Sequence, residues 1–354
     1  MSLFVIGYYA LLLAASCLAA YMGRNKIFML LFSLTLVSFV LGIIGGVPAL
    51  RAVVVIAGLL ALSAMVSYAF REFLIQIAPE LTAKELRTAP LTAAFGMFVI
   101  FTYAVAGIFA PVIAPYGEAE IITSAFAPAD ENLLLGADQL GRDMFSRLVY
   151  GARNTVGLAL VATTLAFLMG ALAGLFAAVK GGWIDQALGR IADVIMSIPS
   201  LIFALLMLSI FGTNLIVIVI VVAVIYSPRV FRLTRAVAGN IVVMDYIEAA
   251  KLRGEGTWYL IRREILPNST APLIAEFGLE FCFVFLLIAG LSFLGLGIQP
   301  PTADWGSMVR ENATLISFGD ITPLIPAAAI ALLTVAVNFV VDWMLYRSSG
   351  LKEK

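Results

Sequence analysis

Residues 245–268 read DYIEAAKLRGEGTWYLIRREILPN, the longest polar-rich interval in the second half of the chain. The stretch lies between segments that are apolar enough to cross a membrane. Asp245 is expected to cap a short helix, and Glu248, three residues later, completes a capping-box pattern. Gly254 supplies the stop, because glycine adopts the left-handed conformation of a helix end most easily. The first half of the stretch therefore predicts a short helix with both ends specified.

The second half of the stretch predicts another short helix. It can begin at Thr257 and is expected to end before Pro267, because proline cannot continue the hydrogen-bond ladder of a helix. The whole interval thus predicts a helix–turn–helix that lies outside the membrane at one end of a bundle. Such a shape suits docking into a cleft on another protein.

The composition places the chain in a membrane. Of its 354 residues 62% are hydrophobic and only 12% are charged, whereas soluble domains are roughly half apolar and about a quarter charged. The sequence therefore predicts an all-helical integral membrane protein in contact with lipid. The formal net charge is zero and no basic block is present, which argues against a nucleic-acid partner.

Catalytic and metal-binding chemistry finds little support in the residue types. The chain contains no histidine, which removes the commonest general base and all histidine-containing zinc sites. Cys17 and Cys282 both lie inside apolar segments, without a disulfide framework or metal-ligand spacing. We therefore expect no catalytic residue, no metal site and no bound cofactor in this chain.

Nine apolar runs are each long enough to cross the hydrocarbon core as a helix. These runs cover residues 3–22, 27–46, 51–70, 91–113, 154–179, 191–211, 214–236, 270–291 and 321–346.

Lysine and arginine set the orientation, because they collect in the short loops on the cytoplasmic side. Their distribution places the amino terminus outside, and 245–268 and the carboxyl terminus in the cytoplasm. The interval 114–153 must then lie outside although it carries several arginines. Within it, residues 144–149 predict an interfacial amphipathic helix, with Asp143 and Arg147 as an i,i+4 ion pair.

A polar break at 78–90 is the only sizeable one in the first half of the chain. It predicts two units: a three-helix membrane segment over 1–80, and a six-helix domain over 81–354 that contains the short helices of about 245–266.

Residues 245–268 resemble the EAA signature of the membrane subunits of binding-protein-dependent ABC importers. The broad consensus has isoleucine where this chain has Glu264, and the Ile-Leu-Pro-Asn ending is similar to the dipeptide/oligopeptide and nickel branch of that family. The matching residues are Glu248, Ala249, Ala250, Gly254, Ile265, Leu266 and Pro267.

Three further stretches resemble the same branch, in the right order and spacing. They are Leu135–Arg153, then Asp193 with Ile198–Ser200, then Leu291–Gly306. The resemblance covers roughly 90–310 and is greatest to the C-type partner of a heterodimeric peptide permease. It implies a six-helix type I importer core, here preceded by three additional transmembrane helices.

The resemblance also implies a mechanism and a set of partners. A second, B-type permease subunit would complete the pore, and an extracytoplasmic binding protein would deliver the solute. Two ATPase subunits would bind ATP and Mg²⁺, since this chain has no Gly-x-x-x-x-Gly-Lys-Ser/Thr phosphate loop. The chain itself is thus expected to be a permease and not an enzyme, in the bacterial or archaeal cytoplasmic membrane. Its branch handles dipeptides, oligopeptides, nickel and other small solutes.

The family's coupling role maps onto one cytoplasmic segment, which would sit in a groove on an ATPase subunit. The usual carboxyl-terminal motif is mostly lost, so this segment is the main ATPase contact expected. Its candidate coupling residues are Asp245, Glu248, Ala249, Ala250, Gly254, Ile265, Leu266 and Pro267.

Glu276 and Glu280 lie one helical turn apart near the start of the 270–291 run. Carboxylates inside a membrane are costly and are often functional. They could contact a peptide amine or relay protons, and the second role would make the chain a proton-coupled secondary transporter. Alternatively, both lie at the cytoplasmic interface or pair with the second permease subunit.

The outer loops supply candidates for contact with the binding protein: Asp138, Arg142, Asp143 and Trp305. Trp305 could equally be an aromatic anchor at the membrane surface. Gly170 and Gly174 belong to a small-residue face, which predicts close helix packing rather than a pore lining.

Overall fold

The computed structural model describes residues 27, 30, 34, 35 and 48–348. The helix predicted over 3–22, and nearly all of the one over 27–46, lie outside the described residues. The chain divides into two compact units, Met1–Ile77 and Ala78–Lys354. In the first unit the long helix α3 covers Pro48–Ile77.

The second unit is built of helices, and its described residues contain no named strand. Short π-helical turns cover Ala152–Val156 and Leu260–Ile265, and a 3₁₀ helix covers Ala313–Phe318. The α-helices are α4 (Glu80–Arg87), α5 (Leu91–Ile108), α6 (Ala110–Ile113), α7 (Met144–Gly151), α8 (Gly157–Lys180), α9 (Gly182–Met196), α10 (Ser200–Phe211), α11 (Leu215–Val242), α12 (Asp245–Leu252), α13 (Thr257–Tyr259), α14 (Leu266–Phe293), α15 (Trp305–Asn312) and α16 (Leu324–Ser348).

Six helices of the described chain are long and apolar enough to cross a membrane, and the number is seven when one bent pair of helices is counted as a single span. They confirm the helices expected over 51–70, 91–113, 154–179, 214–236, 270–291 and 321–346, although the third and the fifth begin 10 and 13 residues earlier than expected. The six spans are Gly58–Ile77, Leu91–Ile108, Met144–Lys180, Leu215–Val242, Thr257–Phe293 and Leu324–Arg347.

The bent pair differs from the single helix expected over 191–211. It consists of α9 and α10, which meet at an angle of 86°. Pro199 lies at the break with an extended backbone (φ −55°, ψ 127°), and the residue before a proline disfavours the helical conformation. The expectation of one continuous helix was therefore wrong.

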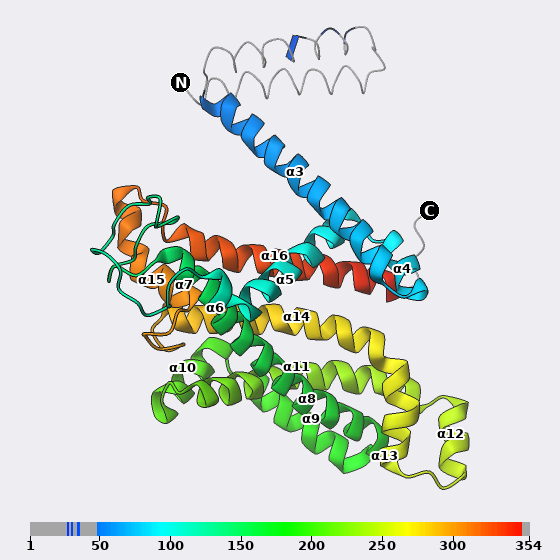
Figure 1. Ribbon diagram of the computed structural model, residues 1–354. Coiled ribbons are helices and arrows are strands. Elements are labelled where there is room, and N and C mark those ends of the chain that lie inside the picture. The colour runs from blue at the N-terminus through cyan, green and yellow to red at the C-terminus, as the bar shows by residue number, and fades with distance from the viewer. Residues whose placement is uncertain (1–26, 28–29, 31–33, 36–47, 349–354) are drawn as a thin grey trace. The chain divides into compact units, whose positions relative to one another are not determined.

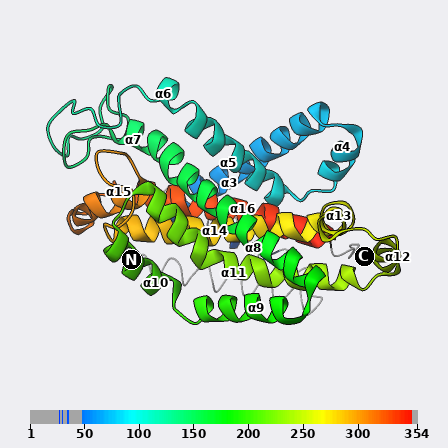
Figure 2. The same cartoon turned by 90° about the horizontal axis from the view of Figure 1, so that it is seen from below.

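The second unit has two distinct ends. Helices α12 and α13 form one end, and α7, α10 and α15 lie at the other (Figures 1 and 2). An ion pair between Glu85 of α4 and Arg347 of α16 places α4 beside the last turns of α16. The spans between the ends pack closely: a Cβ atom on Gly96 of α5 would lie 2.3 Å from the Ala336 carbonyl oxygen of α16.

Helices α8 and α11 make an equally close approach, as the small-residue face predicted. A Cβ on Gly170 would lie 2.4 Å from the Ser227 carbonyl oxygen, and one on Gly174 would lie 2.7 Å from that of Phe231. No larger side chain fits without separating the two backbones. The glycines therefore set the distance between two core helices.

Replacing Gly170 by leucine is expected to destabilise the protein by about 3 kcal/mol, since the added atoms meet backbone that cannot move aside. Gly157→Leu is the matched control in the same helix, because a Cβ there meets no atom within 4 Å. Thermal unfolding of both variants in detergent would measure the difference. Equal melting temperatures would contradict this account of α8–α11 packing.

Candidate functional site

The amino end of α12 is specified differently from the expected capping box. Met244, with an extended backbone (φ −76°, ψ 144°), precedes the helix, and no side chain caps it. The Met244 carbonyl oxygen accepts hydrogen bonds from the amides of Ile247 (2.9 Å) and Glu248 (3.3 Å). Asp245 is thus already inside the helix, and the predicted capping box was wrong. Asp245 and Glu248 still favour the helix as carboxylates in its first turn.

The carboxyl end of α12 is a Schellman motif around Gly254. The Gly254 amide donates to the Lys251 carbonyl oxygen (2.9 Å), and the Glu255 amide donates to that of Ala250 (3.2 Å). Gly254 has a φ of +83°, which confirms the predicted left-handed stop. A Cβ there would meet no atom within 4 Å. The glycine is therefore required by its backbone conformation and not by crowding within this chain.

One face of α12 is fixed to the membrane bundle. Ile247 and Ala250 are fully buried and share a cluster with Leu175 of α8 and Ala238 of α11. The segment after the turn completes this cluster with Leu260, Ile261 and Ile265. Ala250 and Ile265, two of the candidate coupling residues, are therefore internal packing residues. The sequence reading missed Ile247, although its i,i+3 spacing with Ala250 was the available signal.

The opposite face of α12 is open. Asp245, Glu248 and Ala249 are exposed, and the Leu252 side chain is 84% exposed. Val243, just before the helix, is also among the most exposed apolar residues. An apolar surface on a short helix at the end of a bundle is the kind of surface that partners bind.

The helix after the turn does not end before Pro267, contrary to expectation. Residues 257–293 form one continuous helical span of 37 residues. The π-helical turn Leu260–Ile265 directly precedes the proline. Proline would break the regular ladder, and a π-helical turn is a known way to absorb such a break. Leu266 and Pro267 themselves are exposed.

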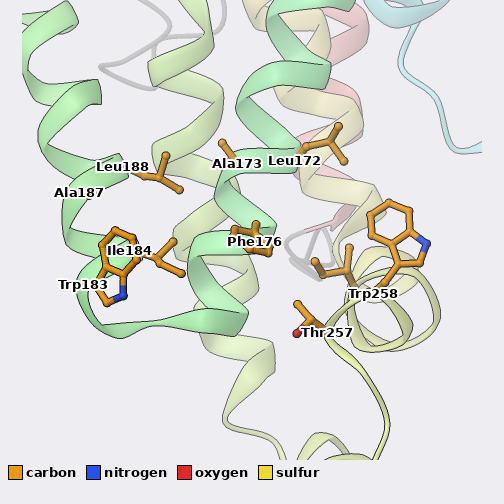
Figure 3. Close-up of a pocket in the computed structure, with 10 residues that line it drawn as sticks. Leu172, Ala173, Phe176, Trp183, Ile184, Ala187, Leu188, Thr257 and Trp258 are labelled. Carbon is orange, nitrogen blue, oxygen red and sulfur yellow. The ribbon is translucent and has the colours of Figure 1, made fainter.

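An apolar groove lies beside this junction. Its volume is about 700 Å³, and α8, α9 and α13 supply its walls. Phe176 of α8 lies between Trp183 of α9 and Trp258 of α13, both of which are exposed (Figure 3). Helix α13 therefore contacts α8, and α9 lines the same groove.

Glu276 and Glu280 lie in the middle of α14, because the helix starts earlier than predicted. The expectation that they lie near the start of their helix was therefore wrong. Glu280 is only 2% exposed, and its Oε2 has no hydrogen-bond partner among the described residues. Both carboxylates interact electrostatically with Arg229 of α11. Two carboxylates of α14 and one arginine of α11 thus lie near one another within membrane-length helices.

At the other end of the unit, four charged side chains form a buried network. The Arg142 Nε lies 2.7 Å from Asp138 Oδ2, and its Nη2 lies 3.1 Å from Glu311 Oε2. Arg147 contacts the same two carboxylates at 3.2 Å and 3.4 Å. All four side chains are 7% exposed or less. Asp138 and Arg142 are therefore scaffold residues, with no surface of their own for a binding protein.

Asp143 does not pair with Arg147 as expected. It caps α7 by accepting hydrogen bonds from the amides of Phe145 (3.3 Å) and Ser146 (2.8 Å), which leaves Arg147 to Asp138 and Glu311. Helix α7 is the first part of the Met144–Lys180 span and not a separate interfacial helix.

Trp305 is neither a surface contact nor a membrane anchor, since it is 1% exposed. Its Nε1 donates to the Leu148 carbonyl oxygen (2.9 Å), and its ring packs edge-on against Tyr103 and Phe285. A Cβ on Gly151 would lie 2.4 Å from the indole. Trp305 therefore joins α15 to α5, α7 and α14.

These features together define a membrane transport subunit: membrane-length helices, one of them broken, charged groups within the bundle, and a short helix held out from one end. Comparison with known proteins makes the class specific. The family described as "Binding-protein-dependent transport system inner membrane component" matches residues 162–349.

Full-length relatives agree. The di/tripeptide transport system permease protein of Pseudomonas aeruginosa is 35% identical, over 70% of this chain and 84% of that protein. The dipeptide transport system permease protein of Alkalihalophilus pseudofirmus is 34% identical, over 73% and 85%. The probable D,D-dipeptide transport system permease protein of Escherichia coli is 33% identical, over 73% and 86%.

The chain therefore belongs to the family of binding-protein-dependent transport system inner membrane components. It is a multi-pass permease subunit of an ABC importer, which confirms the resemblance seen in the sequence. The proton-coupled secondary transporter gains no support from these comparisons. No group of His, Cys, Asp and Glu able to hold a metal ion occurs among the described residues.

Proposed function

We propose that this chain forms half of the translocation pore for peptides or related small solutes, and that α12 and α13 couple the pore to ATP hydrolysis by separate ATPase subunits. The observation that carries the proposal is the two-faced α12. Ile247 and Ala250 seat the helix on α8 and α11, while Leu252 and the first-turn carboxylates remain available to a partner. The peptide substrate class is supported by the names of the relatives.

The proposed complex contains a second, B-type permease subunit, two ATPase subunits that hold ATP and Mg²⁺, and an extracytoplasmic binding protein. The end with α12 and α13 faces the cytoplasm, together with the carboxyl end of α16, and the amino terminus lies outside. The outer position of Arg142 and Arg147 fits this orientation, because Asp138 and Glu311 neutralise both arginines inside the protein. Because the four candidate residues Asp138, Arg142, Asp143 and Trp305 are buried, the binding protein would contact the exposed residues around them.

Replacing Leu252 by aspartate tests the docking surface. When the complex is purified through this chain, we expect the variant to recover at most a tenth of the ATPase subunit that the wild type recovers. An apolar anchor commonly contributes more than about 1.4 kcal/mol to the binding free energy of an interface. The fold should survive, since Leu252 is 84% exposed.

Phe318→Asp is the matched control, because Phe318 is also 84% exposed but follows α15 at the opposite end of the unit. It should retain the ATPase subunits fully. Equal recovery of ATPase with both variants would contradict the proposed role of α12, and absence of any ATPase from the wild-type complex would contradict the proposed function as a whole.

A further inference from the structure

The break between α9 and α10 leaves backbone without helical structure in the middle of a membrane-length span. Ser197, Ile198 and Pro199 lie between the two helices. Irregular backbone at membrane depth is tolerated only where protein buries it or where it lines a water-filled cavity. A cavity of about 360 Å³ lies at this place, and Ile198, Pro199 and Ser200 line one side of it. The break therefore belongs to a cavity and not to a lipid-facing surface.

Arg229 lies on the other side of this cavity, near the middle of α11. Its guanidinium carbon is 5.5 Å from the centre of the Tyr226 ring and 4.9 Å from that of Phe283. No carboxylate of the described chain lies within ion-pair distance of it. Arg229 is nevertheless exposed. An exposed arginine at the centre of a span is too costly to face lipid, so it must face a polar space or a partner.

The chemistry of the cavity favours a carboxylate. Stacking on aromatic rings uses the face of the guanidinium and leaves its N–H groups to bind a carboxylate in the bidentate manner. Helix α10 begins at the same cavity with Ser200, and no side chain caps it, so its first amides also favour an anion. Glu276 and Glu280 of α14 interact electrostatically with Arg229, but neither forms an ion pair that would occupy its guanidinium N–H groups.

We propose that this cavity binds the carboxylate of the transported solute, with Arg229 as its principal anion-binding residue. The inference rests on the proposed function and narrows its substrate class. A solute with a free carboxylate, such as an unmodified peptide, fits the cavity, whereas a bare metal cation such as Ni²⁺ would be repelled by Arg229. The solute would occupy this site only briefly as it crosses the pore, after the binding protein has released it.

The test uses the complete complex with its binding protein, reconstituted in proteoliposomes. Two probes, trialanine and trialanine amide, are each supplied at full occupancy of the binding protein. Arg229→Gln should lower ATP-driven uptake of trialanine at least tenfold, and Arg229→Lys should restore part of it. Wild-type complex should prefer trialanine to its amide, and Arg229→Gln should remove that preference. ATPase stimulation by the loaded binding protein should stay near the wild-type rate.

Arg190→Gln is the matched control: it removes the same charge from α9 at a residue that does not line the cavity. It should keep the wild-type preference. The proposal is overturned if Arg229→Gln keeps that preference, or if it loses uptake of both probes together with ATPase stimulation, which would indicate a structural role. Uptake of Ni²⁺ in place of trialanine would also overturn it. A wild-type complex that imports neither probe would instead contradict the proposed function.

Discussion

The variant Gly254→Val is expected to abolish ATP-driven uptake while the subunit still inserts and assembles. The backbone at Gly254 has a φ of +83°, which costs an ordinary residue about 1–2 kcal/mol and a β-branched residue more. A valine Cβ would meet no atom within 4 Å. The effect must therefore act on the backbone, by re-forming the turn that joins α12 to α13 and shifting the exposed face of α12.

Two controls separate the backbone effect from the added side chain. Gly256→Val makes the same change two residues further on, where the backbone is extended (φ −75°, ψ 162°) and also has open space. It should leave transport intact. Gly254→Asn should retain most activity, because asparagine tolerates the left-handed conformation.

The measurement is paired: ATPase rate and solute uptake by the reconstituted complex. For Gly254→Val we expect ATP hydrolysis that no longer responds to the loaded binding protein and uptake reduced at least tenfold. If the variant showed normal uptake and normal stimulation of its ATPase activity by the binding protein, the turn at Gly254 would have no role in coupling.

The second large effect is expected at the opposite end of the unit, from Asp138→Asn. This change leaves Arg142 and Arg147 buried with Glu311 as their only nearby carboxylate partner in the network. Removing one partner from a buried ion pair typically costs about 3–5 kcal/mol. Asparagine can still accept the hydrogen bonds that Asp138 Oδ1 receives from the amides of Leu140 and Arg142. The loss of stability would therefore measure the effect of removing the negative charge.

Asp130→Asn is the matched control in the same loop before α7. Asp130 is exposed, and its Oδ1 accepts hydrogen bonds from two backbone amides, which an asparagine oxygen can also accept. Thermal unfolding in detergent and protease cleavage of this loop would compare the two. We expect a lower melting temperature and faster cleavage only for Asp138→Asn. Identical behaviour of the two variants would show that the buried network contributes little.

The sequence was a good guide where one local property decides the structure. Apolar runs of about twenty residues predicted the spans, and a glycine after a short run of helix formers predicted the turn at Gly254. Close helix packing at Gly170 and Gly174 was predicted from residue size alone, whereas its partner α11 was not. Order and spacing of four motifs were sufficient to predict the family, because each motif reinforces the others.

Helix boundaries were harder to predict, because polar residues were taken as ends. The spans that begin at Met144 and Thr257 run through polar turns and, in the second case, through Pro267. Hydropathy does not register a bend, so the break at Pro199 was also missed. As a result, the sequence placed Glu276 and Glu280 near the start of their helix, whereas the structure places them in its middle.

The charged network and the cavity could not be predicted, because their members come from distant parts of the chain. Arg142 and Glu311 are 169 residues apart, and no periodic pattern relates them. Arg229 was left without a role, although an arginine near the middle of the apolar helix was the available signal. The role proposed for Arg229 depends on the break between α9 and α10, which lines the same cavity and lies beside Arg229 only in the folded chain.

The continuity of α13, the π-helical turn and α14 has a mechanical consequence. The helical segment Thr257–Phe293 is continuous, with α12 before its first residue and the loop that holds Trp305 after its last. The segment is not straight, because α13 and α14 point in different directions (Figures 1 and 2). A displacement of α13 would therefore turn the near end of α14 sideways, through the bend that joins the two helices, and would not push α14 along its own axis.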